Sequence, residues 1–471
     1  MLLRFIAPVL RKVLGFGGIY VLRPYFAHQS EHYFILFLYK KSDDTITSVR
    51  FEGVYMDTTV YLNGSEVGQW KYGYSTFEFD LTEYIRDGEN ELVVKVDHHS
   101  PNTRWYSGAG IYRKVYLFER RRSHILPDGI YTSTKKVSGG FELLVSTESA
   151  RPEGVDLWHY NIRSTVYDIS GNEVASVTSK ACACDRSCID ELVLKEGYNY
   201  SVTHQNIFIE NPKLWDVEQG NLYTVKTELL VNGEVVDCEN TRVGFKTFEF
   251  TTDKGFFING HHLKLHGCCE HHDLGALGAA VNRAAIKRKL IKLRSMGINS
   301  IRTSHNMPAK EFMELCDEMG FLVVSEAFDM WERQKTEYDY ARFFKQWVSK
   351  DVASWVRRDR NHASITMWSL GNEAEGYKCQ DKCYKMLKDL GTDIPVHYEG
   401  VCRTRRYHYD VFSEMYTHQD DMIKIRDRKR GKQYQEVPFY LCEYCHAMGV
   451  GPGAMEEYMQ LFYSDDIFLG G

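Results

Sequence analysis

Two glutamates that each follow a short apolar segment are the residues best placed to do chemistry. Glu373 ends the segment MWSLGNE, and Glu443 ends the segment FYLCE. A pair of carboxylic acids can hydrolyse an acetal, because one protonates the leaving oxygen while the other attacks the anomeric carbon. Either glutamate alone is equally compatible with an ion pair at the end of a strand. Glycoside hydrolysis therefore depends on whether the surrounding elements bring the two side chains face to face.

The segments before these glutamates alternate between helix and strand. Apolar side chains recur at helical spacing along Ala284–Met296, and the apolar strand Ile298–Thr303 follows. The same order then repeats, with a helix that begins at Pro308 and the strand Phe321–Ser325. Each of the two helices ends at a glycine, as many helices do. A helix followed by a buried strand, twice in succession, predicts a parallel sheet.

Seven apolar strand segments follow one another after residue 250, and an eighth begins just before the chain ends. This order predicts a (β/α)8 TIM barrel over 251–471 that stops within strand eight. Glu373 and Glu443 then follow strands four and seven, at the carboxyl ends where such barrels carry their chemistry. We also expect unpaired edges at strands one and seven, and therefore poor stability. The predicted strands are Leu263–His266, Ile298–Thr303, Phe321–Ser325, Ile365–Leu370, Pro395–Tyr398, Val411–Met415, Phe439–Cys442 and Ile467–Leu469.

The first half of the chain is rich in short β-strand patterns separated by turn signals. Asn63-Gly64 and Asn232-Gly233 follow alternating segments, as two-residue hairpin turns do. The segment Glu191–Leu194 has a similar pattern and is also predicted to be a strand. A break near 121–128 divides this half, so we predict two β-sandwiches in tandem.

Length, charge and cysteine usage narrow the class of protein. The 471 residues exceed one ordinary domain, and the net charge of −6 argues against nucleic acid as a partner. Twelve cysteines at irregular spacing do not form a disulfide framework, so we expect a cytoplasmic location. Arg4, Arg11 and Lys12 interrupt the apolar start, and no segment reaches the ~18 apolar residues of a membrane span. We therefore predict neither a secretory signal nor a membrane partner.

Several segments resemble motifs of glycoside hydrolase family 2. The segment GNEAEG at 371–376 is similar to the acid/base motif of the family, and LCEYCHAMG at 441–449 resembles the nucleophile motif of its β-galactosidases. RWYSGAGIYR at 104–113 resembles a signature of the first domain of the family. NPKLW at 211–215 and VGFK at 243–246 are similar to the end of the second domain. The resemblance covers about residues 48–471.

This resemblance implies a jelly-roll sugar-binding domain over 1–122, an immunoglobulin-like β-sandwich over 123–250 and a catalytic barrel. It implies Glu373 as acid/base and Glu443 as nucleophile of a double displacement through a glycosyl-enzyme. The implied partner is a β-galactoside oligosaccharide, from which the enzyme removes terminal β-D-galactose; a homo-oligomer is compatible with it. The alternatives are another family activity, β-glucuronidase or β-mannosidase, and an inactive truncated sugar-binding fragment. The implied sugar-pocket residues are Asn372 at the 2-hydroxyl, His305, Tyr416 on the nucleophile, His446 near the 6-hydroxyl and Asn102 on a first-domain loop.

Departures from the family pattern concern metals and the two ends of the chain. Many family β-galactosidases hold magnesium beside the acid/base through a carboxylate and a histidine after strand three, but Met330 stands at the carboxylate position here. We therefore predict no metal or cofactor, with magnesium as the alternative. The Cys- and His-rich segment 266–273 lacks the paired spacing of structural zinc. The first domain is shorter than in the family and strand eight lacks its Trp-rich end, so the chain is expected to be truncated at both ends.

Overall fold

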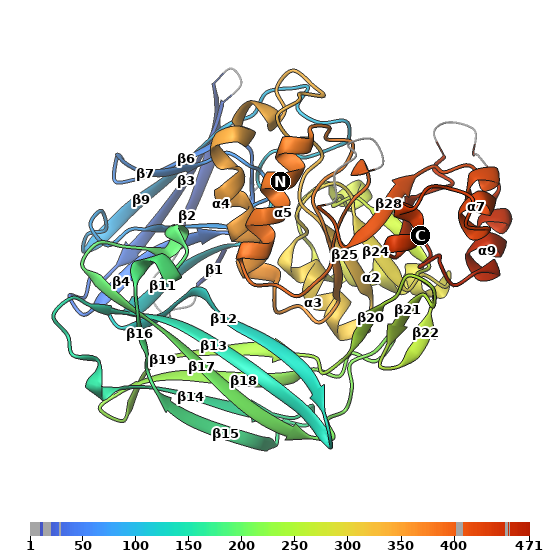
Figure 1. Ribbon diagram of the computed structural model, residues 1–471. Coiled ribbons are helices and arrows are strands. Elements are labelled where there is room, and N and C mark those ends of the chain that lie inside the picture. Colours follow the sequence, from blue (N-terminus) through green and yellow to red (C-terminus); the bar gives the residue numbers. More distant parts are fainter. Residues whose placement is uncertain (1–9, 13–19, 28–29, 402–407, 448–450, 452) are drawn as a thin grey trace.

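The computed structural model describes residues 10–12, 20–27, 30–401, 408–447, 451 and 453–471. Two β-sandwiches and a parallel barrel pack against one another, with the first sandwich in blue, the second in green and the barrel from yellow to red (Figure 1). The predicted multidomain class, two sandwiches followed by a barrel, is confirmed. The boundaries 1–122, 123–250 and 251–471 stay predictions. Arg4 lies outside the described residues, and none of the described helices is long and apolar enough to cross a membrane.

The first sandwich consists of two main sheets around an apolar core. Alternate residues of its strands point inward, and Phe51, Val60 and Val94 are completely buried between the sheets. Asn63 and Gly64 both have positive φ and form the predicted hairpin turn. One sheet has the order β2 (Tyr20–Ala27), β3 (Ser30–Tyr39), β9 (Gly88–Asp97), β6 (Thr58–Leu62), β7 (Ser65–Trp70); the other has β1 (Leu10–Lys12), β11 (Val115–Arg121), β4 (Thr45–Phe51), β8 (Phe77–Asp80); β5 (Val54–Tyr55) pairs with β10 (Gly110–Ile111).

The second sandwich consists of two four-stranded sheets, and one segment that the sequence predicts to be a strand is a short helix instead. Glu191–Leu194 does not form a strand, because the Asp190 carboxylate accepts a hydrogen bond from Leu192 N and starts a short 3-10 helix. The sheets have the orders β12 (His124–Val137), β13 (Gly140–Pro152), β17 (Tyr198–Glu210), β16 (Ala183–Cys184), and β15 (Glu173–Lys180), β14 (Tyr160–Tyr167), β18 (Tyr223–Val231), β19 (Glu234–Val243). The short 3-10 helices are η1 (Leu157–His159), η2 (Arg186–Cys188), η3 (Glu191–Val193) and, in the barrel, η4 (Gly275–Leu277).

A small antiparallel sheet precedes the barrel and changes the bounds of strand one. Asn259 and Gly260 have positive φ, and the turn that they form folds the next residues back onto the preceding strand. The chain therefore enters the parallel sheet at Gly267, four residues later than the predicted start at Leu263. The small sheet consists of β20 (Phe248–Phe250), β21 (Phe256–Ile258) and β22 (His261–Leu263).

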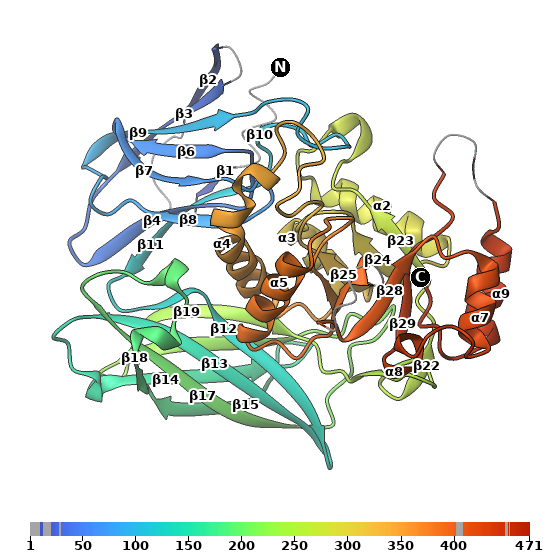
Figure 2. The same ribbon diagram turned by 45° about the horizontal axis from the view of Figure 1, so that its top comes forward.

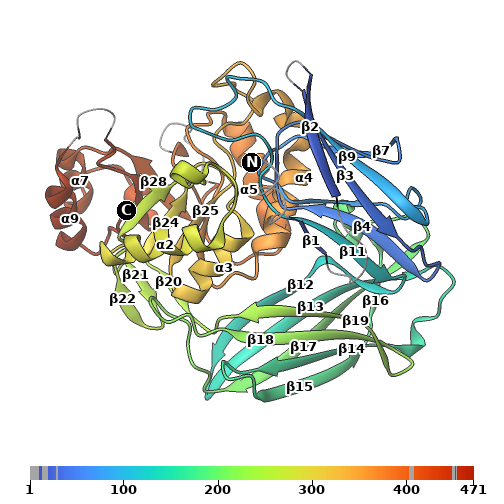
Figure 3. The same cartoon turned by 180° about the vertical axis from the view of Figure 1, so that it is seen from behind.

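The barrel strands run parallel in sequence order, and the helices lie outside them (Figure 3). The two predicted helix-strand units are confirmed, and the helix before strand three ends at Gly320 in the left-handed conformation. The strands are β23 (Gly267–Glu270), β24 (Ser300–Thr303), β25 (Leu322–Glu326), β26 (Ile365–Ser369), β27 (Val396–Tyr398), β28 (Val411–Met415) and β29 (Phe439–Glu443). The helices are α2 (Arg283–Ser295), α3 (Lys310–Met319), α4 (Ala341–Asp359), α5 (Tyr377–Asp389), α7 (Gln419–Arg426), α8 (Gln433–Glu436) and α9 (Met455–Ser464).

The last residues of the chain close the barrel between strands one and seven. Leu469 N donates to Phe439 O at 2.9 Å on the strand-seven side, and Leu265 N donates to Leu469 O at 2.8 Å on the other. Gly471 N also donates to Leu265 O at 3.0 Å. Phe468 and Leu469 are completely buried. The expectation of two unpaired edges is therefore wrong, because one short segment forms backbone hydrogen bonds with both edges.

Helix α4 lies where both sandwiches meet the barrel (Figure 2). Its Asp351 is completely buried and accepts hydrogen bonds from Trp70 Nε1 at 2.9 Å and Ser75 Oγ at 2.6 Å, both in the first sandwich. The hydroxyl of Tyr340 also donates to it. Burial raises the pKa of Asp351 to about 7, although these donors oppose the shift. The contact between the sandwich and the barrel therefore holds a carboxyl group that is protonated below neutral pH.

We expect Asp351→Asn to weaken the pH dependence of stability. The folded protein keeps the Asp351 proton up to a pKa of about 7, whereas an unfolded chain releases it near the ordinary value of 3.8. The folded state of the wild type therefore loses stability as pH rises between these two values. Asparagine removes that loss, so the melting temperature should differ less between pH 5 and pH 8 in the variant. Asp389→Asn, at an exposed site, is the control, and equal slopes in wild type and Asp351→Asn would contradict the prediction.

Candidate active site

Glu373 lies on the loop that follows β26, with its side chain 38% exposed. Its φ of 44° is in the left-handed region that non-glycine residues rarely occupy, and such strain is common at functional sites. The backbone holds this conformation because Glu373 N donates to Glu399 Oε1 at 2.7 Å. Its carboxylate accepts a hydrogen bond from Arg104 Nη1 at 2.8 Å. Glu373 is therefore fixed from the barrel side and from the first sandwich.

Glu443 is the last residue of β29 and has cationic and hydroxyl partners. Arg302 Nη1 donates to Glu443 Oε1 at 2.5 Å, and the hydroxyl of Tyr416 donates to Oε2. His305 Nε2 lies 3.8 Å from Oε1. Burial would raise the pKa of Glu443, but Arg302 and the Tyr416 hydrogen bond outweigh it and hold the pKa below its usual value. The ionised form of Glu443 is therefore the stable one.

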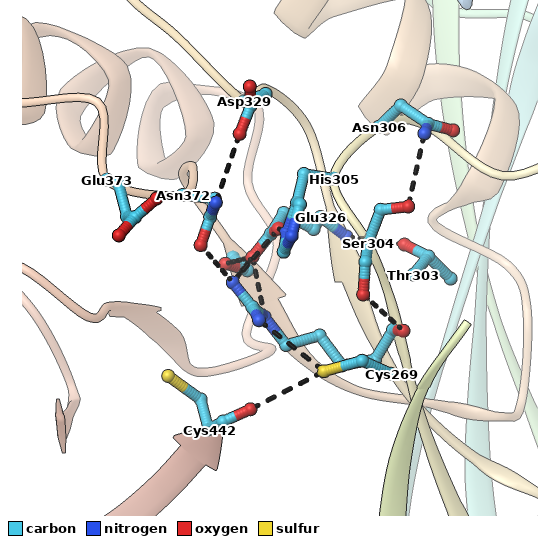
Figure 4. Close-up of polar contacts among 12 residues, drawn as sticks. Cys269, Thr303, Ser304, His305, Asn306, Glu326, Asp329, Asn372, Glu373 and Cys442 are labelled. Carbon is cyan, nitrogen blue, oxygen red and sulfur yellow. Dashed lines mark hydrogen bonds and ion pairs between the residues drawn. The ribbon is translucent and has the colours of Figure 1, made fainter. Parts of the chain in front are cut away.

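The partners of Glu443 belong to a buried network across the barrel mouth, shown in part in Figure 4. Arg302 makes a two-point ion pair with Glu326, with distances of 2.8 and 3.1 Å. Glu326 is completely buried and also accepts from His305 Nδ1 at 2.7 Å. Burial would raise the pKa of Glu326, but the Arg302 charge lowers it to about 2. The network therefore keeps Arg302 and His305 in place beside the carboxylate of Glu443.

Asn372 connects this network to the loop of Glu373 (Figure 4). Its side-chain oxygen accepts from Arg302 Nη2 at 3.1 Å, and its amide nitrogen donates to Asp329 Oδ1 at 3.0 Å. Asn372 N also donates to Phe328 O at 2.9 Å. Both ends of the amide are therefore oriented, and one arginine contacts both Glu443 and the residue before Glu373.

The structure brings His305, Asn372, Tyr416 and both glutamates to the same end of the barrel. His446 is exposed and lines a cavity of about 230 Å³ together with Glu443. Asn102 is buried and accepts a hydrogen bond from Tyr55 at 3.0 Å. It lines a small cavity that His305 also lines, so the first-sandwich loop reaches the barrel mouth. The roles predicted for these residues stay predictions.

Sequence reasoning missed five charged residues that organise the site. Arg302 is the one charged residue in an otherwise uncharged predicted strand, which was an available signal. Glu326 follows an apolar strand in the same way as Glu443 and had the same signal. The other three residues lie on loops, where no local sequence pattern marks them. The missed residues are Arg104, Arg302, Glu326, Asp329 and Lys335.

The residues beside Glu373 do not fit the magnesium ion of the family pattern. Met330, at the carboxylate position, is 4% exposed and supplies no oxygen. Asp329 next to it is paired with two cations, Arg104 at 2.7 Å and Lys335 at 2.8 Å. In the described part of the chain, no group of three or more His, Cys, Asp and Glu side chains could hold a metal ion.

Arg302→Leu is expected to destabilise the barrel by about 3–5 kcal/mol, because it leaves the buried carboxylate of Glu326 without its cation. Denaturant unfolding, followed by the fluorescence of the buried tryptophans, measures this change. The double variant with Glu326→Leu should recover part of the loss, since it removes the unpaired charge. Arg283→Leu, which breaks half-exposed pairs with Glu314 and Glu318, is the control and should cost about 1 kcal/mol or less. A loss no larger than that of the control would contradict the prediction.

Comparisons with known proteins give the family context of this geometry. The sequence model for the TIM barrel domain of glycosyl hydrolases family 2 matches residues 250–471. The sugar binding domain of the same family matches 30–121, and a third model, for glycosyl hydrolases family 2, matches 130–246. A GH2 member from Bacteroides cellulosilyticus has a similar structure, with a TM-score of 0.82, 28% identity and coverage of 94% of this chain and 56% of that chain.

Two curated relatives carry different activity names. β-Galactosidase BoGH2A of Bacteroides ovatus is 42% identical over 330 residues, which are 70% of this chain and 37% of the relative. A protein of Formosa agariphila named as a candidate β-glucuronidase is 36% identical over 336 residues, 71% of this chain and 30% of the relative. The matched part of the chain therefore spans well under half of the length of either relative.

Proposed function

Because the chain belongs to glycosyl hydrolases family 2, we propose that it is a retaining exo-glycosidase that removes terminal β-D-galactosyl groups from oligosaccharides. One observation carries the proposal. The two strand-end carboxylates have different environments, since Glu443 is held ionised by Arg302 and Tyr416, whereas Glu373 is more exposed and follows another strand. A retaining glycosidase needs this division between an ionised nucleophile and a carboxylic acid that exchanges protons.

The reaction has two steps on these residues. Protonated Glu373 gives its proton to the glycosidic oxygen while Glu443 attacks the anomeric carbon from the other face, which breaks the glycosidic bond and forms a covalent galactosyl-enzyme. The ionised Glu373 then takes a proton from water, and the resulting hydroxide oxygen attacks the anomeric carbon. Glu443 leaves as a carboxylate, and Glu373 is again protonated.

Neighbouring side chains support each step. Arg302 and Tyr416 donate to Glu443 and orient it towards the anomeric carbon. Burial raises the pKa of Tyr416, as does the carboxylate beside it, so the hydroxyl stays protonated and remains a donor. The amide of Asn372 has two hydrogens, of which Asp329 takes one, so the second can serve the sugar 2-hydroxyl. His305 and Asn102 line one cavity and His446 lines another beside Glu443, and the proposal assigns all three residues to sugar binding.

Galactose is favoured over glucuronate by the relative of higher identity, which is named as a β-galactosidase. The Formosa relative makes β-glucuronide hydrolysis the second candidate.

A panel of p-nitrophenyl glycosides tests the substrate. We expect turnover of the β-galactoside, with the β-glucuronide, β-mannoside and α-galactoside at background. Turnover of the glucuronide alone would replace galactose with glucuronate in the proposal. A 2-deoxy-2-fluoro-β-galactosyl fluoride should label the protein covalently on the peptide that contains Glu443, as measured by mass spectrometry. If no glycoside is hydrolysed and no label forms, the alternative of an inactive sugar-binding fragment replaces the proposal.

A further inference from the structure

Asp329 is the centre of a charged cluster beside Glu373. Its side chain is 2% exposed, and its Oδ1 atom accepts hydrogen bonds from three groups. These are Arg104 Nη2 at 2.7 Å, Lys335 Nζ at 2.8 Å and the Asn372 amide at 3.0 Å. We call Arg104, Asp329, Lys335, Asn372 and Glu373 the Asp329 cluster.

Arg104 joins two carboxylates from different parts of the cluster. One guanidinium nitrogen binds Asp329, and the other binds Glu373 at 2.8 Å. The planar fork of arginine suits such a bridge, because its donors point in fixed directions. Arg104 lies on the first-sandwich loop between β9 and β10, so this sandwich contributes a charge to the barrel mouth.

Lys335 acts on the backbone of the same loop. Its ammonium group donates to Asn372 O at 2.8 Å as well as to Asp329. The carbonyl of Asn372 belongs to the peptide bond that leads into Glu373. Since Glu373 has a left-handed φ of 44°, a fixed preceding peptide limits the positions that its carboxyl group can take.

The site beside Glu373, where the family pattern would hold a metal ion, therefore already contains the positive charges of Arg104 and Lys335. A divalent cation there would need several oxygen ligands, but Met330 offers none, and the Oδ1 atom of Asp329 is already engaged by both cations, which leaves only its Oδ2 atom. The two cations would also repel it at short range. We propose that Arg104 and Lys335 take the place of a metal ion as the positive charge that positions Glu373 and Asn372, so that turnover does not depend on divalent metal. This inference rests on the proposed role of Glu373 as acid/base.

The two cations act through Glu373 and are positioning residues. A misplaced acid/base slows the departure of a poor leaving group, which needs a proton, far more than that of a leaving group that is stable as an anion. Loss of either cation should therefore be visible in the dependence of the rate on the leaving group.

The experiment compares Arg104→Gln and Lys335→Gln with wild type on two β-galactosides. With lactose, kcat/KM should fall about 10- to 100-fold, whereas with 2,4-dinitrophenyl β-galactoside it should change less than about threefold. Arg104→Lys keeps the positive charge but loses the planar fork of donors. Its kcat/KM for lactose should therefore lie between those of Arg104→Gln and wild type. Arg333→Gln is the matched control, because this exposed arginine pairs with Glu375 on a neighbouring loop and should leave both substrates unaffected. An equal loss on both substrates would overturn the positioning role.

Two further experiments test the inference, one with added guanidinium ion and one with a metal chelator. Guanidinium chloride at millimolar concentration should restore lactose hydrolysis in an Arg104→Ala variant but not in Glu373→Gln. Wild type dialysed against a chelator should keep its kcat/KM within about twofold, with or without added magnesium, because its positive charge is built in. Inactivation by the chelator with recovery in magnesium would overturn the inference. If Arg104→Gln does not fold, as judged by circular dichroism, the Lys335→Gln variant and the chelator experiment still test the inference.

Failure of this inference can be told apart from failure of the proposed function. If Glu373→Gln shows no preference for the better leaving group, the role of Glu373 as acid/base is wrong. If Glu373→Gln shows that preference and the Arg104 and Lys335 variants do not, the acid/base role stands and the role of the cations is wrong.

Discussion

Glu443→Gln is expected to lower kcat for p-nitrophenyl β-galactoside by at least about a thousandfold, because the amide cannot form the covalent galactosyl-enzyme. Glutamine has nearly the shape of glutamate, so the Tyr416 hydroxyl still has an oxygen to which it can donate. Arg302 keeps its two-point pair with Glu326, so the barrel should remain folded. The loss should therefore appear in the chemical step. Initial rates measure it, and intact-protein mass spectrometry should show no fluorosugar adduct.

Glu436→Gln is the matched control for this variant. Glu436 is an exposed residue at the end of α8, seven positions before Glu443, and it takes no part in the site. Its kcat should equal that of wild type. If Glu443→Gln retained more than a tenth of the wild-type rate and still formed an adduct, the nucleophile would be another residue. Mapping of the labelled peptide would then identify that residue.

Glu373→Gln should lower kcat/KM for lactose by about 100- to 10,000-fold, which is the usual contribution of a general acid or base. The loss should be much smaller for 2,4-dinitrophenyl β-galactoside, whose leaving group departs without a proton. With this substrate the galactosyl-enzyme forms but hydrolyses slowly, because no base activates the water. Azide needs no such base, so it should accelerate turnover and give β-galactosyl azide. Product analysis by NMR measures both the azide product and its retained configuration.

Glu375→Gln is the control for Glu373→Gln. Glu375 lies two residues further along the same loop, has a similar left-handed φ of 46° and pairs with the exposed Arg333. Its removal tests whether any change of charge on this loop produces the same effect. A Glu375→Gln variant with the same leaving-group dependence and azide response would assign the effect to the loop and would remove Glu373 from the acid/base role.

The fold was predictable where local patterns set the structure. The apolar periodicity of 284–296 and the glycine that follows it predict α2, because burial of one face and a left-handed cap are properties of neighbouring residues. Two of the errors in the predicted strands arose where a side-chain cap or a turn replaced the predicted strand pairing. Asp190 started a 3-10 helix at the predicted strand Glu191–Leu194, and the Asn259-Gly260 turn delayed the first barrel strand to Gly267.

The same distinction applies to the site. Glu373 and Glu443 could be found in the sequence, because each follows a recognisable apolar segment and lies in a motif that resembles the family. The Asp329 cluster could not, since its contacts join residues that are distant along the chain. Arg104 and Glu373 are separated by 269 positions and Arg302 and Glu443 by 141, and no periodicity extends over such separations.

The sequence by itself determined the order of the elements, the two glutamates and the family, because periodicity and motifs are local properties of the chain. Only the tertiary structure decided the surroundings of those glutamates. It brought Arg302 to Glu443 and Arg104 to Glu373, and it placed the last residues between strands one and seven. The physical reason is that charge pairing and strand pairing depend on distances in space, which packing of the sandwiches and the barrel sets.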